Sequence, residues 1–154
     1  MTRRGARGFT LIEMMVVIVV IAIGITLAVP MIEGGLDARE VRRAARQIAA
    51  TMLHCRVEAM SRAEPQGMVI DAERNTIATT DWGRWVRLTD RAVIEEVEGG
   101  ADVGGGVRQF LCYPNGSTSG AAVVIASRKD RASHRLVIRL DPLIGRVDVD
   151  DATS

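Results

Sequence analysis

One carboxylate, Glu13, stands at the head of an apolar run that carries no charge from Met14 to Ile32. A charged side chain inside a membrane helix costs a few kcal/mol, so such residues usually have a partner. If the chain were cut after Gly8, the new α-amine of Phe9 would lie four residues before Glu13, one helical turn away. Glu13 is therefore predicted to pair with that amine. In a neighbouring molecule, the same pairing would set the stagger between subunits.

Two cysteines, Cys55 and Cys112, allow two kinds of chemistry. In an oxidising compartment they could form a disulfide that ties a helix to a later strand, and the alternative is two small buried thiols. Together with His54 and His134 they could hold zinc, but none of the four has paired-ligand spacing. We therefore predict no metal ion and leave the disulfide open.

No group of residues converges on catalysis. Gly116 to Gly120 has the outline of a nucleophile elbow, but its central residue is Thr118 and the segment lies between two expected strands. Glu95 and Glu96 are adjacent, so they point to opposite faces of a strand, and we expect both to be solvated. The sequence predicts a protein that is not an enzyme and needs no cofactor. The alternative is an enzyme tethered to a membrane.

The position of Glu13 depends on the apolar run that follows it. A helix of about 20 residues rises about 30 Å, which matches the hydrocarbon thickness of a bilayer. Residues 9–32 are therefore predicted to form a transmembrane and assembly helix after a leader of residues 1–8, with a kink at Pro30. Arginines flank both ends of the run, so the positive-inside rule alone does not orient it. They are Arg3, Arg4, Arg7, Arg39, Arg42, Arg43 and Arg46.

The segment Arg7-Gly8-Phe9-Thr10-Leu11-Ile12-Glu13 resembles the processing site of type IV prepilins and type II secretion pseudopilins. The resemblance implies cleavage after Gly8 by a prepilin peptidase, N-methylation of Phe9 and retention of the apolar helix. It also implies a single-pass protein in the bacterial inner membrane, in contact with its lipid, with the globular domain in the periplasm. Two alternatives are an ordinary secretory signal, cut near Ala22-Ile23-Gly24, and a plain single-span anchor.

Residues 33–64 predict an amphipathic continuation of the helix, ending near Ala63 because Pro65 and Gly67 follow. Its apolar stripe recurs at steps of three and four residues and should lie on a sheet. The stripe consists of Val41, Ala45, Ile48, Met52, Cys55 and Ala59. Arg56 belongs to the opposite, polar face, which we expect to be solvated.

From Met68 onward the apolar period shortens toward two, which indicates strands. The candidates are 68–70, 76–79, 85–88, 92–97, 107–113, 121–126, 134–140 and a short strand with Val147 and Val149. The first two flank a polar turn and predict a hairpin, whereas the glycines at 99–100 and 104–106 predict a flexible linker. The fold class is α+β: a long N-terminal helix packed on an antiparallel, β-rich globular domain of residues 65–154, as in pilins.

A second resemblance lies near the other end of the chain. Phe110 to Gly120 is similar to the aromatic-x-Pro-x-Gly-small-small-Gly signature of the GspH/FimT group, and Asp141 to Val147 resembles the closing turn and strand of that group. This likeness implies an H-type minor pseudopilin of type II secretion. Its partners would be other minor and major pseudopilins in a short periplasmic filament that helps to export proteins across the outer membrane.

The charge pattern bears on one alternative, a type IV minor pilin that binds DNA for uptake. The net charge is +1 and aromatic residues make up 3% of the chain, so neither a strong basic bias nor a stacking surface is present. A late basic cluster could form a patch: Arg128, Lys129, Arg131, Arg135, Arg139 and Arg146. However, Arg146 is followed by Asp148, Asp150 and Asp151, which would repel phosphate. We therefore expect secretion rather than nucleic-acid binding.

Overall fold

The computed structural model describes residues 10–80 and 85–152, except for the side chains of residues 27–34. The chain divides into two units, Met1–Leu36 and Asp37–Ser154, which are taken separately below. One helix, α1 (Leu11–Arg62), supplies the described part of the first unit and the beginning of the second. It continues through Pro30. Because that side chain lies outside the described residues, the kink stays a prediction.

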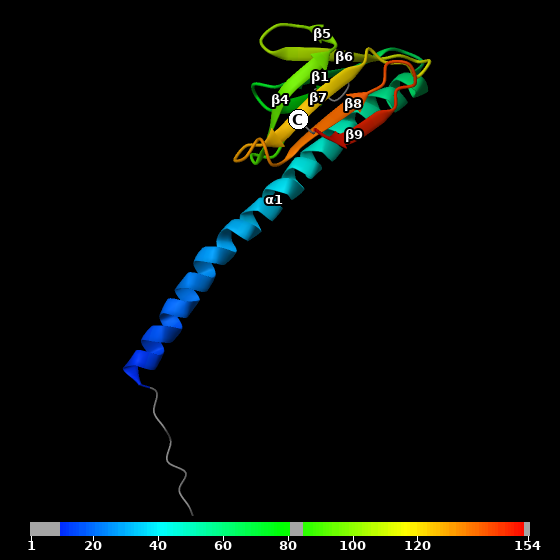
Figure 1. Ribbon diagram of the computed structural model, residues 1–154. Coiled ribbons are helices and arrows are strands. Elements are labelled where there is room, and N and C mark those ends of the chain that lie inside the picture. Colours follow the sequence, from blue (N-terminus) through cyan, green and yellow to red (C-terminus); the bar gives the residue numbers. More distant parts are fainter. Residues whose placement is uncertain (1–9, 81–84, 153–154) are drawn as a thin grey trace, which may run out of the picture. The chain divides into compact units, whose positions relative to one another are not determined.

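The second unit contains two antiparallel sheets (Figure 1). The first sheet has the strand order β3-β2-β1-β6-β5, and its strands are β1 (Gln66–Asp71), β2 (Thr76–Thr79), β3 (Val86–Arg87), β5 (Ala101–Asp102) and β6 (Val107–Cys112). The second sheet has the order β4-β7-β8-β9, and its strands are β4 (Ala92–Gly99), β7 (Ala121–Ser127), β8 (Arg135–Leu140) and β9 (Val147–Asp151). The predicted class, a helix packed on antiparallel β-structure, is confirmed.

The predicted apolar stripe of the helix forms one side of the core. All six stripe residues from Val41 to Ala59 are buried, with exposed fractions of 1% or less. They share one cluster with side chains of both sheets, among them Phe110, Ile125 and Ile138. Burial of apolar area at about 25 cal/mol per Å² is the main force that holds the helix against the sheets. The helix ends where predicted, because Ala63 adopts a positive φ of 55° just after Arg62.

Three strand predictions needed correction. The glycine-rich linker contains a short strand, β5, which pairs with β6 through Ala101–Gln109 and Asp102–Arg108. The strand expected at residues 85–88 is limited to Val86–Arg87, and residues 81–84 beside it lie outside the described part of the chain. The alternation over residues 134–140 predicts that Val137 shares the polar face of β8 with Arg135 and Arg139, yet Val137 is buried, because both faces of that strand are covered over part of its length.

Candidate functional site

The start of α1 is built around Thr10 and Glu13. The backbone N–H of Glu13 donates to the Thr10 Oγ1 at 3.3 Å, and the Met14 N–H donates to the Thr10 carbonyl at 3.3 Å. Thr10 is thus the N-cap residue, and Glu13 occupies the third helical position, where a carboxylate is favoured by the helix dipole. The Glu13 side chain is exposed. Its predicted partner, the amine of Phe9, and the predicted cleavage site after Gly8 lie outside the described residues.

The large apolar side chains around Glu13 are uncovered in the described part of the first unit. Twelve large ones between Leu11 and Ile25 are exposed, from Val17 at 45% to Leu11 at 78%. A contiguous apolar surface of this kind marks contact with lipid or with another protein. Within the described residues, no helical stretch combines the length and the apolarity needed to cross a membrane. The span predicted at residues 9–32 includes residues outside that part, so it stays a prediction.

In the second unit, two turns that carry the GspH/FimT-like motifs lie against each other. The first turn, 113–117, is closed by the Gly116 N–H donating to the Tyr113 carbonyl at 2.9 Å. The second, 141–145, is closed by the Gly145 N–H donating to the Asp141 carbonyl at 3.0 Å. Thr118 joins them, because its N–H donates to the Pro142 carbonyl at 2.9 Å and its hydroxyl to the Asp141 carbonyl at 3.1 Å.

Arg56 fastens these turns to α1. Its Nε donates to the Gly116 carbonyl at 3.1 Å, and the side chain lies so close to Gly145 that a Cβ there would be 2.6 Å from the Arg56 Cδ. We call Arg56 with turns 113–117 and 141–145 the turn cluster. The sequence indicated both turns but placed Arg56 on a solvated face, which is wrong: it is half-buried under them.

The second turn of the cluster presents two apolar side chains to solvent. The Asp141 Oδ1 accepts the N–H groups of Leu143 at 2.8 Å and Ile144 at 3.0 Å, and these bonds hold the pKa of Asp141 below its usual value. Leu143 is 81% exposed and Ile144 57%. The charged cap thus fixes the backbone of a turn whose tip is apolar and uncovered by the described chain.

Cys55 and Cys112 are brought together. Both are buried, unbridged thiols, one on α1 and the other at the end of β6. A hydrogen bond from the Cys55 thiol lowers the pKa of Cys112, more than burial raises it, and the nearby charge of Arg56 adds to the lowering. The two thiols are unbridged in the structure, and the disulfide that the sequence left open stays a prediction.

Four of the six residues of the late basic cluster lie near acidic side chains. Its ion pairs join Arg135 to Glu95 at 2.9 Å, Arg139 to Asp150 at 3.1 Å and Arg146 to Asp148 at 2.8 Å. Arg131 also approaches Glu95, at 3.7 Å. Glu95 is therefore not simply solvated, as the sequence suggested, and a β-bulge between Ile94 and Glu96 alters the alternation of faces on which that prediction was based.

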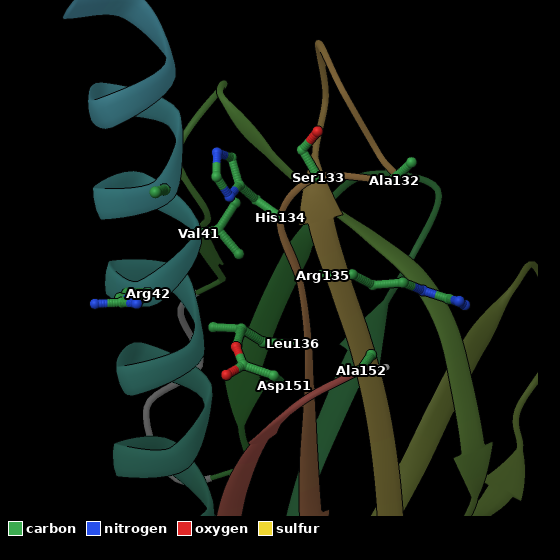
Figure 2. Close-up of a pocket in the computed structure, with 10 residues that line it drawn as sticks. Val41, Arg42, Ala132, Ser133, His134, Arg135, Leu136, Asp151 and Ala152 are labelled. Atoms are coloured by element: carbon green, nitrogen blue, oxygen red, sulfur yellow. The ribbon is translucent and has the colours of Figure 1, made fainter. Parts of the chain in front are cut away.

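A pocket of about 520 Å³ lies between α1 and the β8–β9 edge of the second sheet (Figure 2). Val41, His134, Leu136 and Asp151 line it, whereas Figure 2 shows the Arg135 side chain directed away from α1. The neighbouring Ser133 hydroxyl donates to Asp130, and no described hydrogen bond pairs it with His134. This arrangement gives no activated nucleophile.

Comparisons with known proteins agree with this arrangement. Residues 3–29 match the prokaryotic N-terminal methylation motif. The chain is 38% identical over 72 residues to type II secretion system protein H of Xanthomonas campestris pv. campestris. That match covers 47% of this chain and 43% of the Xanthomonas protein, less than half of either.

Two solved structures share the fold. The minor pseudopilin EpsH from the type 2 secretion system of Vibrio cholerae matches with a TM-score of 0.57 and 12% identity, over 75% of this chain and 99% of that one. The type IV minor pilin FimU of Pseudomonas aeruginosa matches with a TM-score of 0.50 and 13% identity, over 71% and 91%. At these identities the likeness establishes the fold, which is that of pseudopilins and pilins.

Proposed function

We propose that this chain is a minor pseudopilin, a non-enzymatic structural subunit of a type II secretion pseudopilus. The observation that carries the proposal is the combination, in one chain, of a methylation motif at residues 3–29 with a pseudopilin fold. The local identity to a type II secretion protein H favours the H-type position. The protein would be anchored in the inner membrane by residues 9–32, with the globular domain in the periplasm, beside other minor and major pseudopilins.

The N-terminus would supply the assembly chemistry. A prepilin peptidase would cut after Gly8 and the amine of Phe9 would be methylated, which keeps the nitrogen basic and therefore cationic at neutral pH. Glu13 is exposed and stands in the first turn of a helix whose large apolar side chains from Leu11 to Ile25 are uncovered. In lipid, pairing between Glu13 and a Phe9 amine would give each charge a partner of opposite sign and offset part of the cost of placing it in an apolar medium, so the packed stagger that brings them together is favoured.

The globular domain would move together with the part of α1 that packs on its sheets. Three polar contacts, spaced along the second-unit part of α1, tie the helix to the sheets. At one end the Arg91 guanidinium pairs with the buried Asp37 at 2.8 Å. At the other end are the Arg56–Gly116 bond and the Cys55 thiol, which donates to the Gln66 carbonyl at 3.5 Å. A subunit held in this way would transmit axial movement of its helix to its domain.

Replacement of Glu13 tests the assembly role. We expect Glu13→Ala, in the full-length chain, to be inserted and processed normally but to lose co-purification with neighbouring pseudopilins after extraction in mild detergent. Glu13→Asp, which keeps the charge, should retain part of it. Thr26→Ala is the matched control, because Thr26 is exposed in the same helix and its hydroxyl bonds only its own turn, at the Ala22 carbonyl. Co-purification of Glu13→Ala at the wild-type level would contradict the role.

The alternative is a DNA-binding minor pilin, and the fold shared with FimU is the observation that favours it. The ion pairs of Arg135, Arg139 and Arg146 speak against it, because a cation already paired with a carboxylate offers less to phosphate. A gel-shift titration of the full-length protein in detergent at several salt concentrations separates the two. Salt-sensitive binding that is lost in Arg135→Ala/Arg139→Ala would favour DNA uptake.

A further inference from the structure

The two cysteines meet at one residue of the first sheet. Gln66 pairs with Cys112 in the β1–β6 register, and the carbonyl of the same Gln66 accepts the Cys55 thiol at 3.5 Å. The Cys55 thiol also lies close enough to Cys112 to lower the pKa of Cys112. Both residues are 1% exposed, and neither is bridged. Two thiols that meet at one residue, far apart in sequence and on different elements, are one two-electron oxidation from a covalent bond between helix and sheet.

We propose that Cys55 and Cys112 are a disulfide site that is oxidised by exchange with a dithiol–disulfide oxidoreductase of the compartment receiving the domain. The choice of compartment rests on the proposed function, since a periplasmic domain would meet such enzymes and a cytosolic one would meet reductants. The site itself rests on the position of both cysteines beside Gln66. No described residue covers the pocket beside β9 or the exposed turn tip at Leu143 and Ile144, and neither feature indicates a particular ligand or partner.

The exchange balances as two thiolate attacks. The Cys112 thiolate attacks one sulfur of the oxidoreductase disulfide, that S–S bond breaks, and the second enzyme sulfur leaves as a thiolate. Cys55 then loses its proton and attacks the Cys112 sulfur of the mixed disulfide, which releases the first enzyme sulfur. The chain loses two protons and two electrons, and the oxidoreductase gains both as a dithiol. The order in which the two cysteines attack can be exchanged without changing this balance.

Burial fixes the order of events. With 1% of each cysteine exposed, an enzyme active site cannot reach either sulfur in the folded domain. The exchange must therefore occur before the apolar stripe of α1 closes on the sheets. Once formed, the bond closes a loop from residue 55 to 112 that contains β1 to β6, and it restricts the unfolded chain accordingly.

Refolding in a glutathione buffer tests the site without reference to the compartment. The full-length protein in detergent is unfolded, reduced, and refolded with oxidised and reduced glutathione, and its peptides are then mapped without reduction. We expect a Cys55–Cys112 linked peptide and an intact mass lower by about 2 Da. The oxidised protein should melt roughly 10 °C or more above the same protein treated with a phosphine reductant.

The double variant Cys55→Ala/Cys112→Ala is the control, and its melting temperature should not respond to the reductant. Free thiols or mixed glutathione adducts after refolding would overturn the assignment. So would equal melting temperatures of the reduced and the linked wild-type protein. Because the wild-type chain is compared with itself, this result does not depend on whether the alanine variant folds.

A second measurement separates this proposal from the proposed function. Cells making the full-length protein are quenched with acid, and thiols are trapped with N-ethylmaleimide after denaturation. A linked pair supports oxidation in the cell. If both thiols are alkylated in cells but the Cys55–Cys112 disulfide forms on refolding in glutathione buffer, oxidation in the cell and the periplasmic location would be overturned. The assignment of the two cysteines as a site that can form a disulfide would stand. A linked pair in a protein whose N-terminus is unprocessed would support the disulfide and contradict the pseudopilin.

Discussion

Arg56 joins distant parts of the chain. It donates to Gly116, 60 residues away, and fills the space beside Gly145. A hydrogen bond from a charged donor to a neutral acceptor contributes about 1.5–3 kcal/mol, and the aliphatic stem adds packing under the turns. Removal of Arg56 should therefore loosen the turn cluster and not only remove a surface charge.

The first prediction concerns this contact. Arg56→Ala should lower the free energy of unfolding by about 1.5–3 kcal/mol, because the Gly116 carbonyl loses its donor. Arg43→Ala is the control: its side chain is 75% exposed and lies 3.9 Å from Glu40, so the change should be within about 0.5 kcal/mol. Urea unfolding followed by circular dichroism measures both. Equal effects of the two substitutions would contradict the role given to Arg56.

Asp71 gives a prediction about pH. Burial raises its pKa, but hydrogen bonds from the Arg74 N–H and guanidinium, both at 2.8 Å, outweigh burial and lower the pKa below 3.8. A lowered folded-state pKa means that the ionised carboxylate stabilises the fold. This contribution is complete above the unfolded pKa and is lost as the pH falls through the lower, folded value.

Asp71→Asn should therefore destabilise the protein at neutral pH, by about 1.5–3 kcal/mol, because a charged acceptor is replaced by a neutral one. The difference from wild type should begin to shrink as the pH falls below about 4, where the carboxylate of the unfolded chain becomes protonated, and should be lost as the pH falls through the lower pKa of the folded state. Urea midpoints of the two proteins across this pH range provide the measurement. A difference that stays constant down to the acid end would show that the ionisation of Asp71 contributes nothing.

The sequence reveals residues whose role follows from near neighbours in the chain. It does not reveal residues whose partners are distant in the chain. The buried stripe from Val41 to Ala59 follows from spacing alone, since a helix repeats every 3.6 residues. Asn75 could not be found in this way. Its side chain donates to the Ala92 carbonyl at 2.8 Å and accepts the Ile94 N–H at 3.1 Å, linking the β1–β2 turn to the other sheet. Such partners exist only after folding.

At the scale of elements, the turn cluster depends on a close approach of two backbones. Gly145 has a φ of 60°, and a Cβ built there would lie 2.5 Å from the Gly116 carbonyl oxygen. Gly105 has nearly the same φ, 63°, but a Cβ there would meet nothing within 4 Å. Comparing Gly145 with Gly105 therefore separates the free-energy cost of placing a side chain at positive φ from the cost of crowding between the two turns.

The third prediction uses this pair. Gly105→Ala should cost about 1–2 kcal/mol, the penalty for a side chain in the left-handed region. Gly145→Ala should cost clearly more, because the added carbon also forces the two turns apart and strains the Arg56 bond. Melting temperatures of both variants provide the comparison. An equal fall in melting temperature for the two variants would contradict the close packing of turns 113–117 and 141–145.

Elements with local signals were predictable, and the others needed pairing information. The helix end near Ala63, the β1–β2 hairpin and β7 to β9 follow from breakers and alternation in the sequence. Strand β5 does not, because Ala101–Asp102 has no apolar alternation and is a strand only through its bonds to β6. The division into two sheets was also invisible, since strands that pair across long connections leave no mark on either sequence segment.

At the scale of the whole molecule, the proposed function requires both a processed N-terminus and a pilin-like domain. The sequence predicted both, and the fold of the domain agrees with EpsH. The proposed contact between Phe9 and Glu13 would form after cleavage, within one chain or between subunits. The assembly role of Glu13 is thus the point at which a chemical measurement adds most.

The most direct measurement is the mass of the mature protein extracted from membranes, with fragmentation of its N-terminal peptide. The account predicts a chain that begins at Phe9, carries one methyl group on its α-amine and retains the apolar helix. A mature form that begins after Gly24, as an ordinary secretory signal would give, or an uncut chain with residues 1–8 still attached, would contradict the filament assignment.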